Sequence, residues 1–144
     1  MYYLDTSAFL KLYIREVGST SVQNYLTQQE DPLPLSEILE MEFTNALRLK
    51  VFWGDISQEQ AGEQLALFEK RKKRGFYYYP VVHRSELMAT FRELSENTAK
   101  LGCRTLDVLH VAYARIYGAE DFVTFDAKQK KLALKSGFNV PEMD

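Results

Sequence analysis

Four separated acidic residues have the side chains to form one catalytic centre: Asp5, Glu42, Asp107 and Asp126. A group of carboxylates with no Cys and few His among them is typical of a site for a hard divalent cation, Mg²⁺ or Mn²⁺, and not for zinc or iron. Mg²⁺ takes few protein ligands, keeps several waters and works beside phosphate oxygens. If the fold brings the four acids together, their chemistry predicts phosphate-ester cleavage.

Two of these acids follow expected strands. Asp5 closes the run Tyr2–Leu4, and Asp126 closes the run Phe122–Phe125. In an open parallel sheet, ligands bind outside the carboxyl ends of the strands, so both acids are expected at one rim. A purely structural role is the alternative, because an Asp between a strand and a helix also serves as a helix N-cap.

Glu42 falls on the apolar face of the helix expected around it. The same face holds Ile38, Ala46 and Leu49. An unpaired buried carboxylate costs several kcal/mol, so this acid needs a metal, a hydrogen-bond donor or a cationic partner. A salt bridge, or a position where the apolar stripe meets water, explains the residue equally well.

Asp107 lies in the first turn of an expected helix that is apolar almost all round and is therefore expected to be buried. Thr105 at the N-cap and Asp107 in a favourable first turn provide a structural explanation for both polar residues. His110, one turn later, is more simply a hydrogen-bonded helix histidine than a ligand.

The elements that must position these acids alternate between short strands and helices. Strands are expected at 2–4, 33–35, 76–79 and 122–125, with a further one at 138–140. Helices are expected at 7–14, 20–28, 37–52, 58–74, 84–99, 105–117 and 127–135. This alternation predicts an α/β fold with a central, mainly parallel sheet covered by helices.

Length and composition favour one ordinary globular unit. With 144 residues, no repeat and no long linker, residues 1–144 are expected to form a single domain. The sequence contains neither a leader-like segment nor a run that could span a membrane, and we expect a cytoplasmic protein. Cys103 is the only cysteine and is expected to be a core residue.

The overall charge gives no general attraction for nucleic acid. The net charge is −2 and the pI is about 5.8, so contacts with nucleic acid must be local. The strongest basic run, Lys70–Arg74, is better explained as a solvated helix end, where cations suit the helix dipole. Arg48, Lys50 and the lysines of 128–135 are further candidates, without a ranking.

Other enzyme classes fit less well. An aspartyl-nucleophile phosphatase would need a second acid two residues after Asp5, where this chain has Ser7. No Gly-x-Gly-x-x-Gly motif supports dinucleotide binding, and no Gly-x-Ser-x-Gly motif supports a serine hydrolase.

The sequence resembles the PIN-domain family, and within it the VapC-type toxins of toxin-antitoxin pairs. The resemblance covers nearly the whole chain and depends on four segments in the family's order and spacing: Tyr3–Ala8, Glu42–Leu47, Arg104–Ala112 and Phe122–Asp126. It implies a three-layer α/β/α fold, a homodimer, and a Mg²⁺- or Mn²⁺-dependent endoribonuclease that acts on RNA.

The resemblance also implies individual roles. Asp5 and Asp107 match the principal metal ligands, Glu42 matches an acid that completes the shell or orients water, and Asp126 matches a fourth, more variable acid. Hydroxyl groups that hydrogen-bond these carboxylates are implied at Thr6, Ser7 and Thr124.

A partner antitoxin is implied as well, with a segment that covers the acidic rim and an Arg that replaces the metal. The alternative to a nuclease is a PIN fold with weak or no cleavage that binds RNA or the antitoxin. The sequence does not identify the RNA target.

Overall fold

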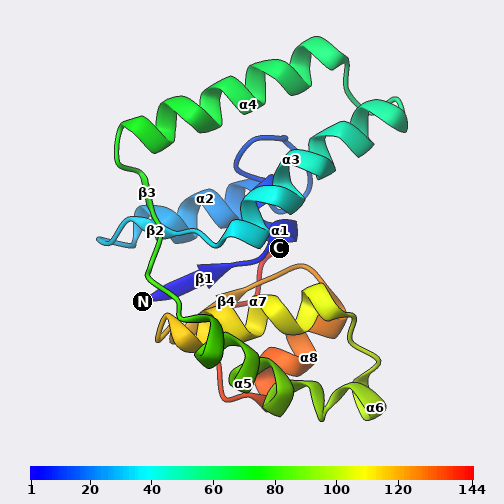
Figure 1. Cartoon of the computed structure of the whole chain (residues 1–144). Coiled ribbons are helices and arrows are strands. Elements are labelled where there is room, and N and C mark those ends of the chain that lie inside the picture. Colours follow the sequence, from blue (N-terminus) through cyan, green and yellow to red (C-terminus); the bar gives the residue numbers. More distant parts are fainter.

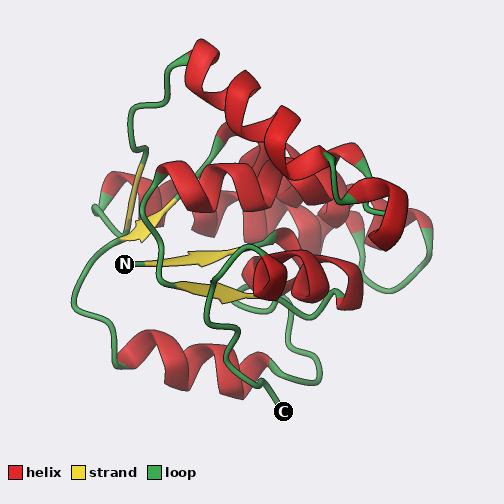
Figure 2. Ribbon diagram, turned by 90° about the horizontal axis from the view of Figure 1, so that it is seen from below, coloured by secondary structure: helices red, strands yellow, loops and turns green.

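The computed structural model describes all residues, 1–144. Four short strands are present: β1 (Tyr2–Leu4), β2 (Leu33–Pro34), β3 (Tyr77–Tyr78) and β4 (Asp121–Val123). Eight helices accompany them: α1 (Thr6–Leu10), α2 (Ser19–Thr27), α3 (Glu37–Phe52), α4 (Gln58–Lys73), α5 (Arg84–Ser95), α6 (Thr98–Leu101), α7 (Thr105–Ile116) and α8 (Ala127–Lys135). Figure 2 shows these elements by type.

All strand pairs are parallel, which confirms the expected α/β fold. β1 pairs with β4, aligning Tyr2 with Asp121 and Leu4 with Val123, while β2 pairs with β3. β2 lies beside β1, but the two pairs are not joined by a hydrogen-bonded ladder. The sheet therefore consists of two short parallel ribbons placed side by side.

Alternation along β1 divides the interior into two cores, because successive side chains of a strand point to opposite faces. Tyr2 and Leu4 pack in a core with α1, α2, α3 and α4. Tyr3 and Phe122 pack in the other core with α5, α7 and α8. Figure 1 shows the strands between these two groups of helices, which is the three-layer arrangement.

Several element boundaries shift by one or two residues, for example that of the strand expected at 122–125, which is β4, and three differences from expectation are larger. The helix expected at 84–99 divides into α5 and α6, where the Asn97 side-chain amide donates to the Leu94 carbonyl oxygen at 3.1 Å. The first helix ends at Leu10 and continues only as turns. The strand expected at 138–140 is a single bridge between Asn139 and Asp121. Pro141 follows, and a proline cannot donate to a ladder.

Smaller expectations can also be compared with the structure. The basic run Lys70–Arg74 does occupy the end of α4, and Cys103 is buried. None of the helices has both the length and the apolar character needed to cross a membrane.

Candidate active site

Asp5 lies at the carboxyl end of β1 and is fully buried. Its backbone amide donates to the Val123 carbonyl oxygen at 3.1 Å, which extends the β1–β4 pairing by one bond. Its Oδ1 accepts hydrogen bonds from Ser7 Oγ at 2.6 Å and from the Ala8 amide at 3.0 Å. Its Oδ2 accepts a hydrogen bond from Thr124 Oγ1. Asp5 is therefore both an N-cap of α1 and the best-anchored acid of the rim.

Burial raises the pKa of the Asp5 carboxyl above its usual value, although the hydrogen bonds from Ser7, Thr124 and Ala8 partly offset the effect. A buried anion lacks the solvation that water would give it. A cation next to Asp5 would remove this penalty, which is what a metal-ligand role requires.

Asp126 follows β4 at the same rim. Its amide donates to Thr124 Oγ1 at 2.9 Å, so one threonine hydroxyl links Asp5 and Asp126. Asp126 Oδ1 caps α8 by accepting from the amides of Lys128 at 2.8 Å and Gln129 at 2.9 Å. Its Oδ2 accepts no hydrogen bond from the chain, so the capping role leaves one carboxylate oxygen available.

Asp107 reaches the rim from the first turn of α7. Its Oδ2 accepts from the Arg104 amide at 2.8 Å, and its Oδ1 lies 3.4 Å from Gln129 Nε2. Gln129 thus contacts both Asp107 and Asp126, although the sequence did not single it out. The sequence did contain a feature that could have indicated Gln129: it is a polar residue on the apolar face of its helix, one turn before the buried Leu132 and Ala133.

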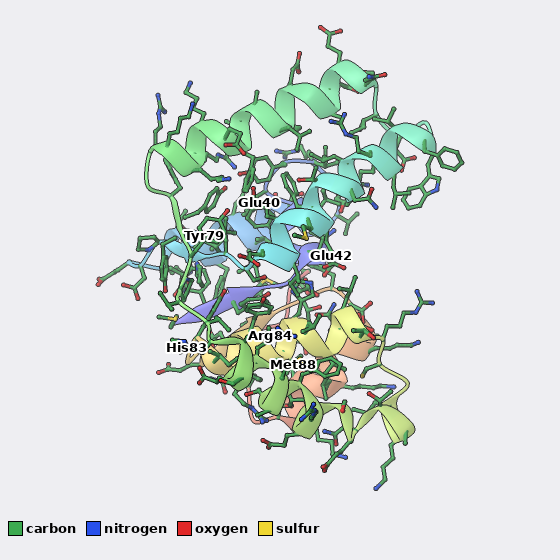
Figure 3. The ribbon with its side chains drawn as sticks, in the orientation of Figure 1. Glu40, Glu42, Tyr79, His83, Arg84 and Met88 are labelled. Atoms are coloured by element: carbon green, nitrogen blue, oxygen red, sulfur yellow. The ribbon has the colours of Figure 1, made fainter.

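Glu42 is partly buried at a groove and not in the core. Its side chain is 27% exposed, and Figure 3 shows it on α3 on the side toward α7. The stripe of Ile38, Ala46 and Leu49 lines the same groove, whereas Leu39, Phe43 and Leu47 make the core face of α3. The rim alternative for this residue is therefore the one that the structure adopts.

Two donors hold one oxygen of the Glu42 carboxylate. Oε2 accepts from Thr6 Oγ1 at 2.6 Å and is hydrogen-bonded to His110 Nε2. Burial alone would raise the pKa of Glu42, but the hydrogen bonds from His110 and Thr6 outweigh it and lower the pKa below its usual value. Oε1 accepts no hydrogen bond from the chain, so Glu42 is an ionised acid with one free oxygen.

Hydroxyl groups at Thr6, Ser7 and Thr124 do hydrogen-bond the carboxylates, as the family resemblance implied. His110 is buried, and both of its ring nitrogens have partners: Nε2 with Glu42, and Nδ1 with the Tyr3 hydroxyl at 2.7 Å. The expectation of a hydrogen-bonded helix histidine is confirmed, and Tyr3 is a neighbour of the site that the sequence did not indicate.

The four acids lie at one rim of the sheet, but their carboxylates do not surround a common metal position. Asp5, Asp126 and Asp107 are linked through Thr124 and Gln129, and Glu42 is hydrogen-bonded to Thr6, the residue after Asp5. No three Asp, Glu, His or Cys side chains are arranged as a closed set of metal ligands.

An open rim of this kind still fits Mg²⁺, which binds through one or two carboxylates and keeps several waters. Asp126 Oδ2 and Glu42 Oε1 are free to accept a cation or its waters, and the donor atoms are all carboxylate oxygens. The predicted ligand roles of the four acids stay predictions.

The chain matches the family model of the PIN domain over residues 2–135, which is nearly its whole length. The chain belongs to the PIN domain family. All four acids of the rim in this PIN domain lie within the matched residues: Asp5, Glu42, Asp107 and Asp126.

Two solved structures resemble this PIN domain closely in fold. VapC20 of Mycobacterium tuberculosis, described as a toxin that cleaves the sarcin-ricin loop, has a TM-score of 0.70 and 14% identity over 96% of both chains. VapBC2 of Rickettsia felis, bound to a DNA fragment of its promoter, has a TM-score of 0.68 and 17% identity over 99% of this chain and 98% of that chain. No sequence among curated proteins matches this chain significantly.

Proposed function

We propose that this PIN domain is a metal-dependent endoribonuclease and the toxin of a VapBC-type pair, acting in the cytoplasm. One observation carries the proposal: Asp5 is a fully buried carboxylate at a strand end, beside a rim of three further acids. The PIN family supports it, and so does the description of the similar VapC20 as a toxin that cleaves the sarcin-ricin loop. We also propose that residues 1–144 form one domain.

Mg²⁺, or Mn²⁺ in its place, is the proposed cofactor, held by Asp5, Glu42, Asp107 and Asp126. When bound, the cation supplies charge neutralisation for the phosphate and activation of water. Ser7 and Thr124 would orient Asp5, and Glu42 Oε1 would accept a hydrogen bond from the attacking water. In the reaction, the water gives up a proton to solvent as its oxygen bonds to phosphorus, the bond to the leaving oxygen breaks, and that oxygen takes up a proton.

The proposed activity is tested by replacing Asp5→Asn, which preserves shape and removes the charge. Cleavage of total RNA is measured with Mg²⁺ and with EDTA. The matched control is Asp121→Asn, because Asp121 lies at the other end of β4, hydrogen-bonded to Tyr25 and Asn139. We expect Asp5→Asn and EDTA to abolish cutting and the control to retain it. Undiminished cutting by Asp5→Asn, or in EDTA, would refute the metal role.

A second candidate, a PIN fold that binds RNA or antitoxin with little cleavage, is favoured by the absence of a closed ligand set. Calorimetric titration with Mn²⁺ followed by the RNA assay separates the two. Metal binding with cleavage supports the nuclease, and RNA binding without either supports the module.

An antitoxin is the proposed protein partner. A groove of about 460 Å³ beside Glu42 is lined by apolar side chains that include Met41, Leu49 and Leu106. These three are exposed, with 67%, 39% and 43% of their surface accessible. An apolar antitoxin segment would fit this groove, and an Arg on it would reach the free carboxylate oxygens in place of the metal.

Titration of Mn²⁺-loaded protein with the antitoxin is expected to release the metal in step with complex formation. Full occupancy by both at once would contradict the shared site. We also propose a homodimer, which sedimentation of the isolated protein tests directly.

A further inference from the structure

A buried line of hydrogen bonds leads from the start of α3 to Glu42. Ser36 Oγ lies 3.1 Å from the Tyr3 hydroxyl, and that hydroxyl lies 2.7 Å from His110 Nδ1. His110 Nε2 is hydrogen-bonded to Glu42 Oε2. Tyr3 and His110 are 0% exposed and Ser36 is 1% exposed, so water cannot replace the bonds among these three residues, whereas the side chain of Glu42 at the end of the line is 27% exposed.

The direction of the line follows from counting hydrogens. Ser36 Oγ has two partners, the Tyr3 hydroxyl and the Leu39 amide at 3.2 Å, and the amide can only donate. The Ser36 hydrogen therefore has one acceptor, the Tyr3 oxygen. In the reverse direction this buried hydrogen would have no acceptor, which is unfavourable because a buried donor without a partner loses its hydration uncompensated.

The same counting fixes the histidine. If Ser36 donates to Tyr3, then Tyr3 donates to His110 Nδ1. The hydrogen of the neutral imidazole is then on Nε2, where it points at the carboxylate of Glu42. A hydrogen on Nδ1 would instead place the lone pair of Nε2 against a carboxylate oxygen, which is repulsive.

We propose that Ser36, Tyr3 and His110 are positioning residues that fix the orientation of the Glu42 carboxylate. In this line of hydrogen bonds Ser36 donates to Tyr3, Tyr3 donates to His110, and His110 donates to Glu42. Since His110 and Thr6 both donate to Oε2, Oε1 is the oxygen left to face the rim. This inference rests on the proposed nuclease function, in which Glu42 is one of the working acids. Groups that orient a ligand in this way typically change metal affinity or activity by about 10–100-fold when they are removed.

The first test removes one hydroxyl from the line. Tyr3→Phe keeps the ring, which stacks on Phe122 at 5.6 Å, and deletes the donor to His110. Tyr117→Phe is the matched control. Tyr117 is buried in the same core, 6.0 Å from the Tyr3 ring, and donates to the Leu35 carbonyl oxygen at 2.9 Å, without contact to Glu42.

A second pair of variants separates the two ends of the imidazole. His110→Gln can place an amide N–H near the position of Nε2 and so keep a donor to Glu42. His110→Asn is shorter, keeps a polar group near Tyr3 and withdraws the donor from Glu42. A merely structural histidine would lose stability in both variants without this difference in activity.

We expect Tyr3→Phe to lower kcat for RNA cleavage, or the affinity for Mn²⁺, by about tenfold relative to Tyr117→Phe, with little change in KM. Cleavage by His110→Gln should exceed that by His110→Asn. Thermal unfolding of all four variants establishes that they are folded. Equal activity of Tyr3→Phe and Tyr117→Phe, or of the two His110 variants, would overturn the proposal.

Nitrogen NMR of the histidines in the wild-type protein decides the direction of the line without any activity. We expect His110 with its hydrogen on Nε2 and an unprotonated Nδ1. A hydrogen on Nδ1 would overturn the proposal even in an active enzyme. A wild-type protein that neither binds Mn²⁺ nor cuts RNA would refute the nuclease function, whereas the position of the His110 hydrogen alone supports or overturns the direction of the line.

Discussion

Thr124 Oγ1 lies 2.5 Å from Asp5 Oδ2, so a hydroxyl at the end of β4 donates to a buried carboxylate at the end of β1. The parallel pairing of the two strands creates this contact, because it aligns their carboxyl ends at one edge. The chain thus holds this buried carboxylate with three hydrogen-bond donors. The stability of the protein and its proposed activity are consequently opposed at Asp5.

Asp5→Asn is expected to stabilise the folded protein at neutral pH. Folding raises the pKa of Asp5, so the native state binds its proton more tightly and stability falls as pH rises from the usual carboxyl range through the folded pKa. The amide is neutral, and its N–H can donate to Thr124 Oγ1. We expect a gain of about 1 kcal/mol, or roughly 3 °C in Tm, in thermal unfolding at neutral pH.

The gain should shrink in acid, where the wild-type carboxyl is protonated and carries no penalty. A gain that is the same at both pH values would contradict the role of the buried charge. The variant keeps its predicted loss of RNA cleavage at every pH.

Glu42→Gln is expected to have the opposite effect. Folding lowers the pKa of Glu42, so its contribution to stability is complete above the usual glutamate pKa and is lost as pH falls through the folded pKa. We expect a loss of about 1 kcal/mol at neutral pH, because hydrogen bonds from His110 and Thr6 to an anion are stronger than those to an amide. Denaturant unfolding at a series of pH values measures it. A loss that persists unchanged in acid would exclude the charge as its cause.

Gln129→Met should separate activity from stability. The substitution removes the contact between Gln129 Nε2 and Asp107. It also removes Gln129 Oε1, a buried atom that has no hydrogen-bond partner. We expect metal affinity to fall by about tenfold while stability is unchanged or slightly higher. The control is Ser136→Ala, which removes the other buried polar atom without a partner, away from the acids. Equal Mn²⁺ affinity in both variants would argue against the role of Gln129.

Gly18→Ala is expected to destabilise the protein through the loop that follows β4. Gly18 has φ 87°, and an added Cβ would lie 2.5 Å from the Phe125 ring, next to Thr124 and Asp126. Gly54→Ala is the control, because Gly54 has φ 78° and open space around it. We expect Gly18→Ala to cost about 1–3 kcal/mol more in thermal unfolding. Equal losses would mean that Phe125 moves aside freely.

Two of the basic residues lie at opposite ends of the sheet, and the proposed RNA contact distinguishes them. Lys128 follows Asp126 in the first turn of α8, whereas Arg74 lines a pocket with Tyr2, at the amino end of β1. We expect Lys128→Gln to weaken RNA binding and to reduce its salt dependence by about one ion, while Arg74→Gln changes neither. Binding to the Asp5→Asn protein at several salt concentrations measures both. A larger effect of Arg74→Gln would place the RNA at the other end of the sheet.

Local pattern was sufficient for most of the secondary structure. The helices Glu37–Phe52 and Ala127–Lys135 have the bounds that their sequence predicts, because capping residues and apolar spacing act within a few turns. At the break between α5 and α6 both the backbone amide and the side-chain amide of Asn97 donate to the Leu94 carbonyl oxygen, a local contact that periodicity does not encode. The position of two acids at strand ends was likewise readable, since it needs only the order of elements.

The sequence by itself therefore determined the parallel α/β fold and the acids that its strand ends carry. Only the tertiary structure decided that Glu42 faces a groove, that Gln129 connects Asp107 with Asp126, and which carboxylate oxygens are left free. The physical reason is distance along the chain: His110 and Glu42 are 68 positions apart, and Thr124 and Asp5 are 119 apart. Such contacts depend on how two cores pack against one sheet, and no local pattern of residues specifies that.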